Sequence, residues 1–172
     1  MEFKTRVRNS IIAGASIYKE VFVNYDYLVY SSGFTNKTYY IISAAEDNYP
    51  HLTGVNPLMS AQEFYNKCLN CTLREEDFNF SSSYSNEKEV KGSVRRKILM
   101  LPTLDTLFAR NLQAEEEFSK GNVFCSLGTT DNALTIGFIS SNATLRPKTL
   151  LKNNELNPSK AVDVAFILRR TR

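Results

Sequence analysis

The sequence has few of the residues that most often carry catalysis or bind metals. It contains one histidine, His51, and three cysteines among 172 residues. An odd number of cysteines without a secretory signal argues against a framework of disulfides. The GxxxxGK[ST], GxGxxG and GxSxG motifs are also absent. The usual sequence support for nucleotide-dependent enzymes and for α/β-hydrolases is therefore missing.

Long apolar runs are missing as well. No segment approaches the roughly 18 consecutive apolar residues that a membrane-spanning helix needs. The first ten residues, MEFKTRVRNS, carry charges where a secretory signal would have an apolar core. We therefore expect a cytoplasmic protein with no membrane partner.

The composition is that of an ordinary globular protein, with 42% hydrophobic and 23% charged residues. A chain of this length predicts a single domain over residues 1–172. The net charge of +3 is too small to establish a nucleic-acid partner. Basic residues nevertheless gather at 88–97, 146–152 and 169–172, a separation that is compatible with a surface facing phosphates.

Hydrophobic periodicity predicts mixed secondary structure. We expect helices over 3–22, 61–70 and 88–101, the last ended or kinked by Pro102, and strands over 25–32, 38–45, 122–128, 133–140 and 161–168. GFTNK and TTDN should form hairpin turns, and the last strand should be buried. Because helices and strands are segregated along the chain, the fold class is α+β, with helices packed on a small, mainly antiparallel sheet of about four to five strands.

His51 stands in the stretch YPHLTGVNP, between two prolines and just before Gly54. An imidazole held in such a turn can titrate near neutral pH and act as a general acid or base. It can instead cap the following helix or bind a loop carbonyl group. Loops carry functional sites disproportionately, but the residues alone leave both interpretations open.

The pair Cys68 and Cys71, in CLNC, could bind zinc if Cys125 and His51 completed the ligand set. Against this, Cys68 falls on the apolar face of its predicted helix, and the chain has no second CxxC motif. Buried free thiols are common in protein cores. We therefore expect no metal site and no cofactor.

The segment LRPKTLLKN, residues 145–153, collects cationic and hydroxyl donors. Arg146, Lys148 and Lys152, together with Thr149, suit the oxygens of a phosphate group, and Pro147 would stiffen their presentation. A solvated basic strand edge, where lysine and proline discourage aggregation, is the alternative.

Several motifs together resemble a known family. The stretches HLTGVNP, SAQEFYNKCLN, KILMLPTLDTLF, IGFI and RPKTLL look like the phage-type barnase–EndoU–colicin–RelE-like nuclease domains, specifically the fourth subfamily. The resemblance covers a nuclease-like core of about residues 20–168, after the N-terminal helix 3–22. It implies a compact α+β fold, with helices on a four-stranded antiparallel sheet.

The resemblance also implies a function. Members are proposed to be metal-independent ribonucleases that act as toxins or effectors in phage and mobile elements. Carried onto this sequence, the implied catalytic residues are His51, Thr53, Lys148 and Thr149, and the residues expected to bind RNA are Arg146, Lys152, Arg169 and Arg170. We therefore expect an endoribonuclease with RNA as substrate and an immunity or host protein as a further partner.

A second function class stays open. Because no second group with a pKa near neutrality is evident, the same fold could be a catalytically inactive module that binds nucleic acid or protein. A phage-encoded inhibitor of a host enzyme would be an example.

Overall fold

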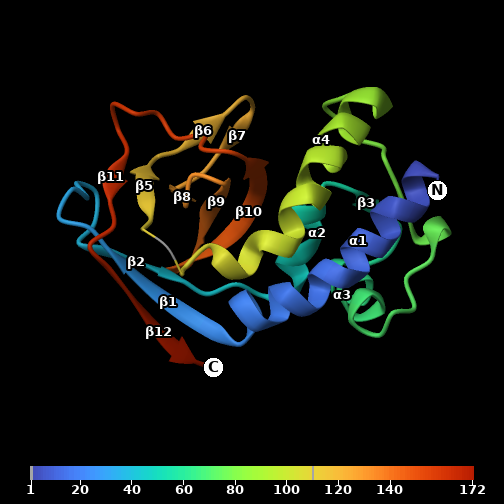
Figure 1. Ribbon diagram of the computed structural model, residues 1–172, viewed down its shortest axis with the longest axis horizontal. Coiled ribbons are helices and arrows are strands. Elements are labelled where there is room, and N and C mark those ends of the chain that lie inside the picture. The colour runs from blue at the N-terminus through green and yellow to red at the C-terminus, as the bar shows by residue number, and fades with distance from the viewer. Residues whose placement is uncertain (1, 110) are drawn as a thin grey trace.

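The protein is described by a computed structural model that covers residues 2–109 and 111–172. Helices gather on one side of the molecule and a curled sheet on the other (Figure 1). The helical elements are α1 (Phe3–Tyr18), the π-helix η1 (Lys19–Val23), η2 (Glu46–Asn48), α2 (Tyr49–Thr53), α3 (Ala61–Leu69), η3 (Glu75–Asp77), α4 (Glu87–Met100) and η4 (Leu101–Thr106). No helix in the described part of the chain combines the length and the apolar character needed to cross a membrane.

The two longest strands, β9 and β10, lie in the second half of the chain. They are β1 (Tyr25–Tyr30), β2 (Tyr39–Ile42), β3 (Asn56–Pro57), β4 (Phe78–Asn79), β5 (Gln113–Glu116), β6 (Ser119–Lys120), β7 (Val123–Phe124), β8 (Leu127–Thr130), β9 (Leu134–Ser141), β10 (Thr144–Lys152), β11 (Val162–Asp163) and β12 (Phe166–Thr171). The strands β3 and β4 form one small ribbon, and β6 and β7 form another. The α+β class is thus confirmed.

The predicted N-terminal helix is confirmed, because α1 continues into η1 and buries Val7, Ile11, Ala15 and Tyr18 along one face. The predicted hairpin follows, with β1 and β2 paired antiparallel. The second strand is shorter than predicted, since the chain turns helical again at Glu46.

Helix boundaries agree with their sequence signals. The Ser60 hydroxyl accepts a hydrogen bond from the Glu63 amide at 3.2 Å, which caps α3. The Asn86 side chain caps α4 in the same way through the amide of Glu89, at 3.0 Å. At Pro102 the α-helix gives way to the 3₁₀-helix η4, as the sequence predicts.

The predicted sheet of four to five strands is wrong in size. Within the described residues, eight strands form one sheet in the order β11-β5-β8-β9-β10-β2-β1-β12. Every neighbouring pair is antiparallel except β10 with β2. The prediction missed β5, whose sequence QAEE lacks an apolar alternation. It considered β10 only as an alternative, as a basic strand edge, because lysine, arginine and proline interrupt the apolar pattern of a central strand.

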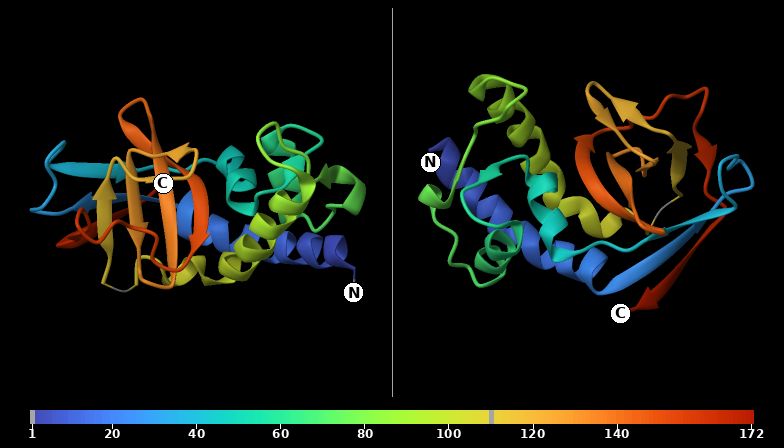
Figure 2. Two further views of the ribbon diagram at one scale, coloured as in Figure 1. Left: turned by 90° about the horizontal axis from the view of Figure 1, so that it is seen from above. Right: turned by 180° about the vertical axis from the view of Figure 1, so that it is seen from behind.

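The strand predicted over 161–168 also needs correction. It breaks after Asp163, and its two parts, β11 and β12, pair at opposite edges of the sheet. Most of β12 is exposed rather than buried, because it is an edge strand. The chain at the break between β11 and β12 is bound to the end of β1 by two hydrogen bonds. The Ser31 hydroxyl donates to the Asp163 carbonyl at 2.6 Å, and the Ala165 amide donates to the Tyr30 carbonyl at 2.8 Å. These bonds bring the two edges of the sheet close together. The sheet therefore curls strongly, as the right-hand view of Figure 2 shows.

The strand β10 connects the sheet to the helices. It meets its parallel neighbour β2 at Leu145, which faces Ile42, and beyond that point α2 and α4 pack against it. The alternative interpretation of 145–153 as a strand edge is therefore right about the strand and wrong about the edge. The segment lies in the middle of the sheet, but helices rather than a strand flank most of one side.

Candidate active site at the bulge of β10

His51 lies on the short helix α2, which begins at Tyr49 and has Pro50 in its first turn. The helix ends at Gly54, whose φ of +78° is in the left-handed region that glycine adopts readily. The predicted turn is therefore a single helical turn followed by the left-handed glycine that the sequence indicates. The imidazole is exposed on the surface, whereas Leu52 and Thr53 are buried beneath it.

Lys148 lies where β10 is irregular. Pro147 faces Phe138 of β9 and Thr149 faces Gly137, so the pairing register skips Lys148. Proline has no amide hydrogen to give to the ladder, which explains a bulge at this position. The packing of α2 against β10 brings Lys148 close enough for its charge to act on His51. The structure thus brings together two of the predicted catalytic residues.

Thr149 and Thr53, the other two residues predicted to be catalytic, have buried hydroxyl groups that are already engaged. The Thr53 hydroxyl donates to the Pro50 carbonyl at 2.8 Å within α2. The Thr149 hydroxyl accepts a hydrogen bond from the Lys97 ammonium at 3.2 Å. Both side chains therefore hold the local backbone and its neighbours in place.

Lys97 on α4 is a residue of this region that the sequence analysis did not single out. Its side chain is 8% exposed, and its ammonium group also donates to the Leu150 carbonyl at 2.8 Å. Burial, reinforced by the charge of Arg96, lowers the pKa of Lys97 to about 8. The signal that could have found it is its position, three residues after Val94 and one before Ile98, on the apolar stripe of the helix.

The surroundings of His51 favour its neutral form. Although His51 is an exposed residue, the atoms packed around it displace part of its hydration, and this desolvation is the largest cause that lowers the pKa of its imidazole. The charges of Lys148 and Lys97 add to it. The carboxylate of Asp47 acts in the opposite direction. Because the net pKa lies below the ordinary value for histidine, the imidazole can accept a proton at neutral pH.

Arg146 adds a third cation at the start of the same strand segment. Its guanidinium lies 3.9 Å from the Asp47 carboxylate. Its Nε atom is buried and has no hydrogen-bond partner among residues 2–109 and 111–172. A buried donor without an acceptor is unusual in a native structure.

A cleft of about 550 Å³ opens beside His51, between α2, the serine-rich segment 81–86 and α4. Its walls carry hydroxyl groups, from Ser81, Ser82, Ser85 and Ser93. Such groups can both donate and accept hydrogen bonds, which suits the sugar and base edges of a nucleotide.

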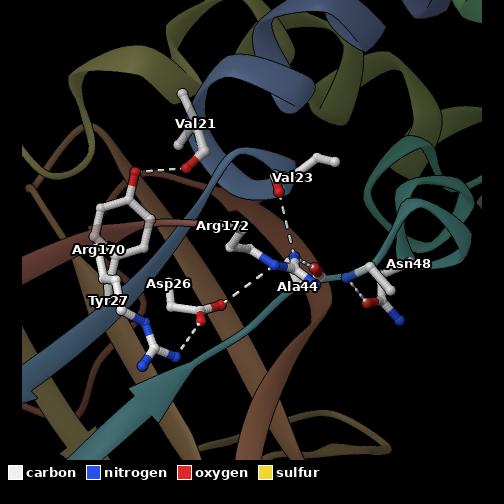
Figure 3. A network of polar contacts seen from close by, with 9 residues as sticks. Val21, Val23, Asp26, Tyr27, Ala44, Asn48, Arg170 and Arg172 are labelled. Atoms are coloured by element: carbon white, nitrogen blue, oxygen red, sulfur yellow. Dashed lines mark hydrogen bonds and ion pairs between the residues drawn. The ribbon is translucent and has the colours of Figure 1, made fainter.

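The remaining predicted RNA-binding residues lie elsewhere. Lys152 is exposed at the end of β10. Arg169 and Arg170 are on β12, which is separated from β10 by β2 and β1. The Arg170 guanidinium donates to the Asp26 carboxylate at 2.8 Å (Figure 3), and that of Arg169 lies 4.2 Å from the centre of the Tyr25 ring. The structure therefore does not group these two arginines with His51.

The residues considered as zinc ligands are placed separately. Cys68 is in the main core, Cys71 is exposed, and Cys125 belongs to a second buried cluster with Phe118 and Leu156. Burial raises the pKa of Cys68 to about 12 and that of Cys125 to about 11, which favours thiols over metal-binding thiolates. Within the described ranges, no three histidine, cysteine or acidic side chains are grouped so that they could hold a metal ion.

Comparison with known proteins agrees with the resemblance drawn from the motifs. A search of curated proteins found no match, and a search of solved structures found none either. The family profile described as phage-Barnase-EndoU-ColicinE5/D-RelE like nuclease4 matches residues 10–166, nearly the whole chain, including α2 and β10. The chain belongs to this family of nuclease-like proteins.

Proposed function

We propose that this protein is a metal-independent endoribonuclease that cleaves RNA by attack of a ribose 2′-hydroxyl on the adjacent phosphate. The observation that carries the proposal is the packing of α2, which carries His51, against β10, whose bulge carries Lys148, in a chain of a nuclease-like family. RNA supplies its own nucleophile in this reaction, so the protein needs a base, an acid and positive charge, each of which these residues can provide.

In the proposed reaction His51 removes the proton of the 2′-hydroxyl, and the 2′-oxygen forms a bond to phosphorus. The bond from phosphorus to the 5′-oxygen breaks, and Lys148 gives that oxygen a proton, which leaves a 2′,3′-cyclic phosphate and a free 5′-hydroxyl. The charges of Lys148 and Arg146 stabilise the negative charge that develops on the phosphate oxygens. Thr149 and Thr53 support the backbone that carries these groups.

The biological setting belongs to the same proposal. The family description names phage nucleases, which supports a role as a phage or mobile-element toxin or effector that acts in the cytoplasm on RNA. Such an activity is harmful to the cell that makes it, so an immunity protein or a host protein would be the second partner.

The direct test is cleavage of total RNA by the purified protein in the presence of EDTA. We expect cleavage to persist and to leave cyclic-phosphate ends. Replacement of the base or the acid, by His51→Ala or Lys148→Ala, should lower the rate by at least about a hundredfold. Lys19→Ala, at an exposed lysine on η1 outside the three basic groups, should cleave like the wild type and is the matched control.

Two outcomes would change the assignment. If EDTA abolished cleavage and a divalent metal restored it, the metal-independent scheme would be wrong. If no variant cleaved RNA but the protein bound RNA in a salt-sensitive way, the inactive binding module would replace the enzyme.

A further inference from the structure

A buried lysine with neutral partners requires an explanation. The two acceptors of the Lys97 ammonium are the Thr149 hydroxyl and the Leu150 carbonyl, both uncharged. The neighbouring charge that acts on Lys97 is another cation, Arg96. A buried charge without an opposite charge destabilises the folded state, even after relaxation of its surroundings. Residues that carry such a cost are often functional.

Lys97 touches both elements of the candidate site. Its ammonium group binds Thr149 and Leu150, the two residues that directly follow Lys148 at the bulge. Its aliphatic stem passes Gly54 at the end of α2, where a Cβ atom would lie 2.8 Å from the Lys97 Cδ atom. The single side chain therefore spans from the helix that carries His51 to the strand that carries Lys148.

We propose that Lys97 is a positioning residue that fixes the bulge of β10 against α2, and that its buried ammonium group acts on the His51 imidazole carried by that helix. This inference rests on the proposed function in so far as it concerns catalysis. Its effect on the histidine can be measured without any activity.

The charges that face His51 come from three elements. Lys148 acts from β10 and Lys97 from α4, and both disfavour the imidazolium form. Asp47 acts from η2 and favours that form, but Arg146 lies 3.9 Å from its carboxylate and offsets part of its charge. If Lys97 is made neutral, one of the two cations is lost, so the balance moves toward protonation and the pKa of His51 should rise.

The test is an NMR titration of His51, whose signal needs no assignment because it is the chain's single histidine. In Lys97→Met, which keeps the length of the side chain and removes its charge, we expect a higher His51 pKa than in the wild type. Lys88→Met removes an exposed charge from the same helix and should leave the His51 pKa unchanged. An unchanged His51 pKa in a folded Lys97→Met protein would overturn the proposal.

A second measurement covers the case in which Lys97→Met does not fold. In the wild type, Lys97 should lose its proton around its pKa of about 8, and the His51 signal should then show a second inflection in that pH range. A His51 signal that stays flat from pH 7 to 9 would equally overturn the proposal.

Activity then separates this inference from the proposed function. If the protein cleaves RNA, Lys97→Met should lower turnover at least about tenfold and move the acid limb of the pH–rate profile to higher pH. If the titrations behave as expected and no RNA is cleaved, the charge of Lys97 does set the state of His51, and the ribonuclease proposal is the part that fails.

Discussion

At the scale of single residues, α2 places two neighbouring polar side chains in opposite surroundings. His51 faces solvent and the cleft, whereas Thr53 is fully buried and its hydroxyl donates a hydrogen bond to the Pro50 carbonyl. The same hydroxyl is 3.4 Å from the amide of Val55, just after the left-handed Gly54. The geometry therefore favours a structural role for Thr53, and its catalytic role stays a prediction from the resemblance.

Replacement of Thr53 by valine tests this distinction. Valine has the same shape without the hydroxyl, so we expect a loss of about 1 kcal/mol in the free energy of unfolding, the usual net worth of one such hydrogen bond. RNA cleavage should stay within a few-fold of the wild type. Urea unfolding and a cleavage assay measure the two effects. A loss of cleavage as large as that of His51→Ala, at unchanged stability, would instead place Thr53 in the reaction.

The site was predictable from the sequence only in part, for reasons that particular residues show. His51 and Lys148 carry chemistry in unusual local sequences, so motif reasoning finds them. Lys97 looked like one more member of the basic run 88–97, because a run of lysines and arginines usually means an exposed face. Its burial depends on β10, a strand about fifty residues later that offers it two acceptors. Its position on the apolar stripe of α4 indicates burial, but no local pattern shows which strand supplies the acceptors.

At the scale of the elements, the same limit explains the sheet. The two hairpins were predictable because their strands are apolar and their turns carry glycine or asparagine. The strand β5 was not, since Glu115 and Glu116 look like solvent-exposed residues. In the structure the Glu115 carboxylate accepts a hydrogen bond from the Asn157 amide at 2.7 Å, and Glu116 binds the hairpin between β1 and β2. Hydrogen bonds from residues far away in the sequence therefore satisfy both carboxylates and allow the segment to form a strand within the sheet.

Glu116 links β5 to β2 and to the turn between β1 and β2, and so helps to hold the sheet in its curled shape. Its carboxylate accepts hydrogen bonds from the amides of Thr35 and Asn36, at 2.7 and 3.0 Å, and from the Tyr40 hydroxyl at 2.6 Å. Burial acts to raise the pKa of this carboxyl, but the hydrogen bonds outweigh it, so the pKa lies below its ordinary value of 4.5. The charged form is the one that stabilises the fold.

Replacement of Glu116 by glutamine should therefore destabilise the protein in a pH-dependent way. We expect a loss of about 1–2 kcal/mol at pH 7, because the side-chain amide cannot accept all of these bonds and the site is partly exposed. A carboxyl with a lowered folded-state pKa stabilises fully above its unfolded-state pKa and loses this effect as the pH falls through the folded-state value. The difference between wild type and variant should thus be constant near neutrality and shrink below about pH 4.5.

Thermal or urea unfolding at several pH values measures this difference. Glu76→Gln is the matched control, because that carboxylate is 71% exposed and forms an ion pair with the equally exposed Arg74. A Glu116→Gln protein as stable as the wild type at pH 7 would show that the closure of the sheet does not depend on this carboxylate.

At the scale of the whole molecule, the basic residues divide between two regions of the sheet. Arg146 and Lys148 are on the part of β10 that faces the helices, and Lys97 reaches it from α4. The carboxylates of Asp47 and Glu89 line the cleft beside this region. Arg169 and Arg170 lie on the edge strand β12, where Asp26 binds Arg170 (Figure 3). The guanidinium group of Arg169 lies over the Tyr25 ring. Both Arg146 and Arg170 face a carboxylate, but Arg170 donates a hydrogen bond to Asp26 at 2.8 Å, whereas Arg146 lies 3.9 Å from Asp47. The looser pair is easier to give up for a phosphate, so the two regions should contribute unequally to RNA binding.

RNA binding by two arginine variants tests this division. In a His51→Ala background, which prevents turnover, Arg146→Ala should weaken binding of a short RNA and reduce the slope of log K against log salt by about one. Arg170→Ala should change both quantities less, because the Arg170 guanidinium is already held by Asp26 at 2.8 Å. Fluorescence anisotropy between about 50 and 200 mM salt gives both numbers. A larger effect of Arg170→Ala would move the RNA path to the exposed edge of the sheet, away from His51, and would leave the cations around β10 without a substrate to explain them.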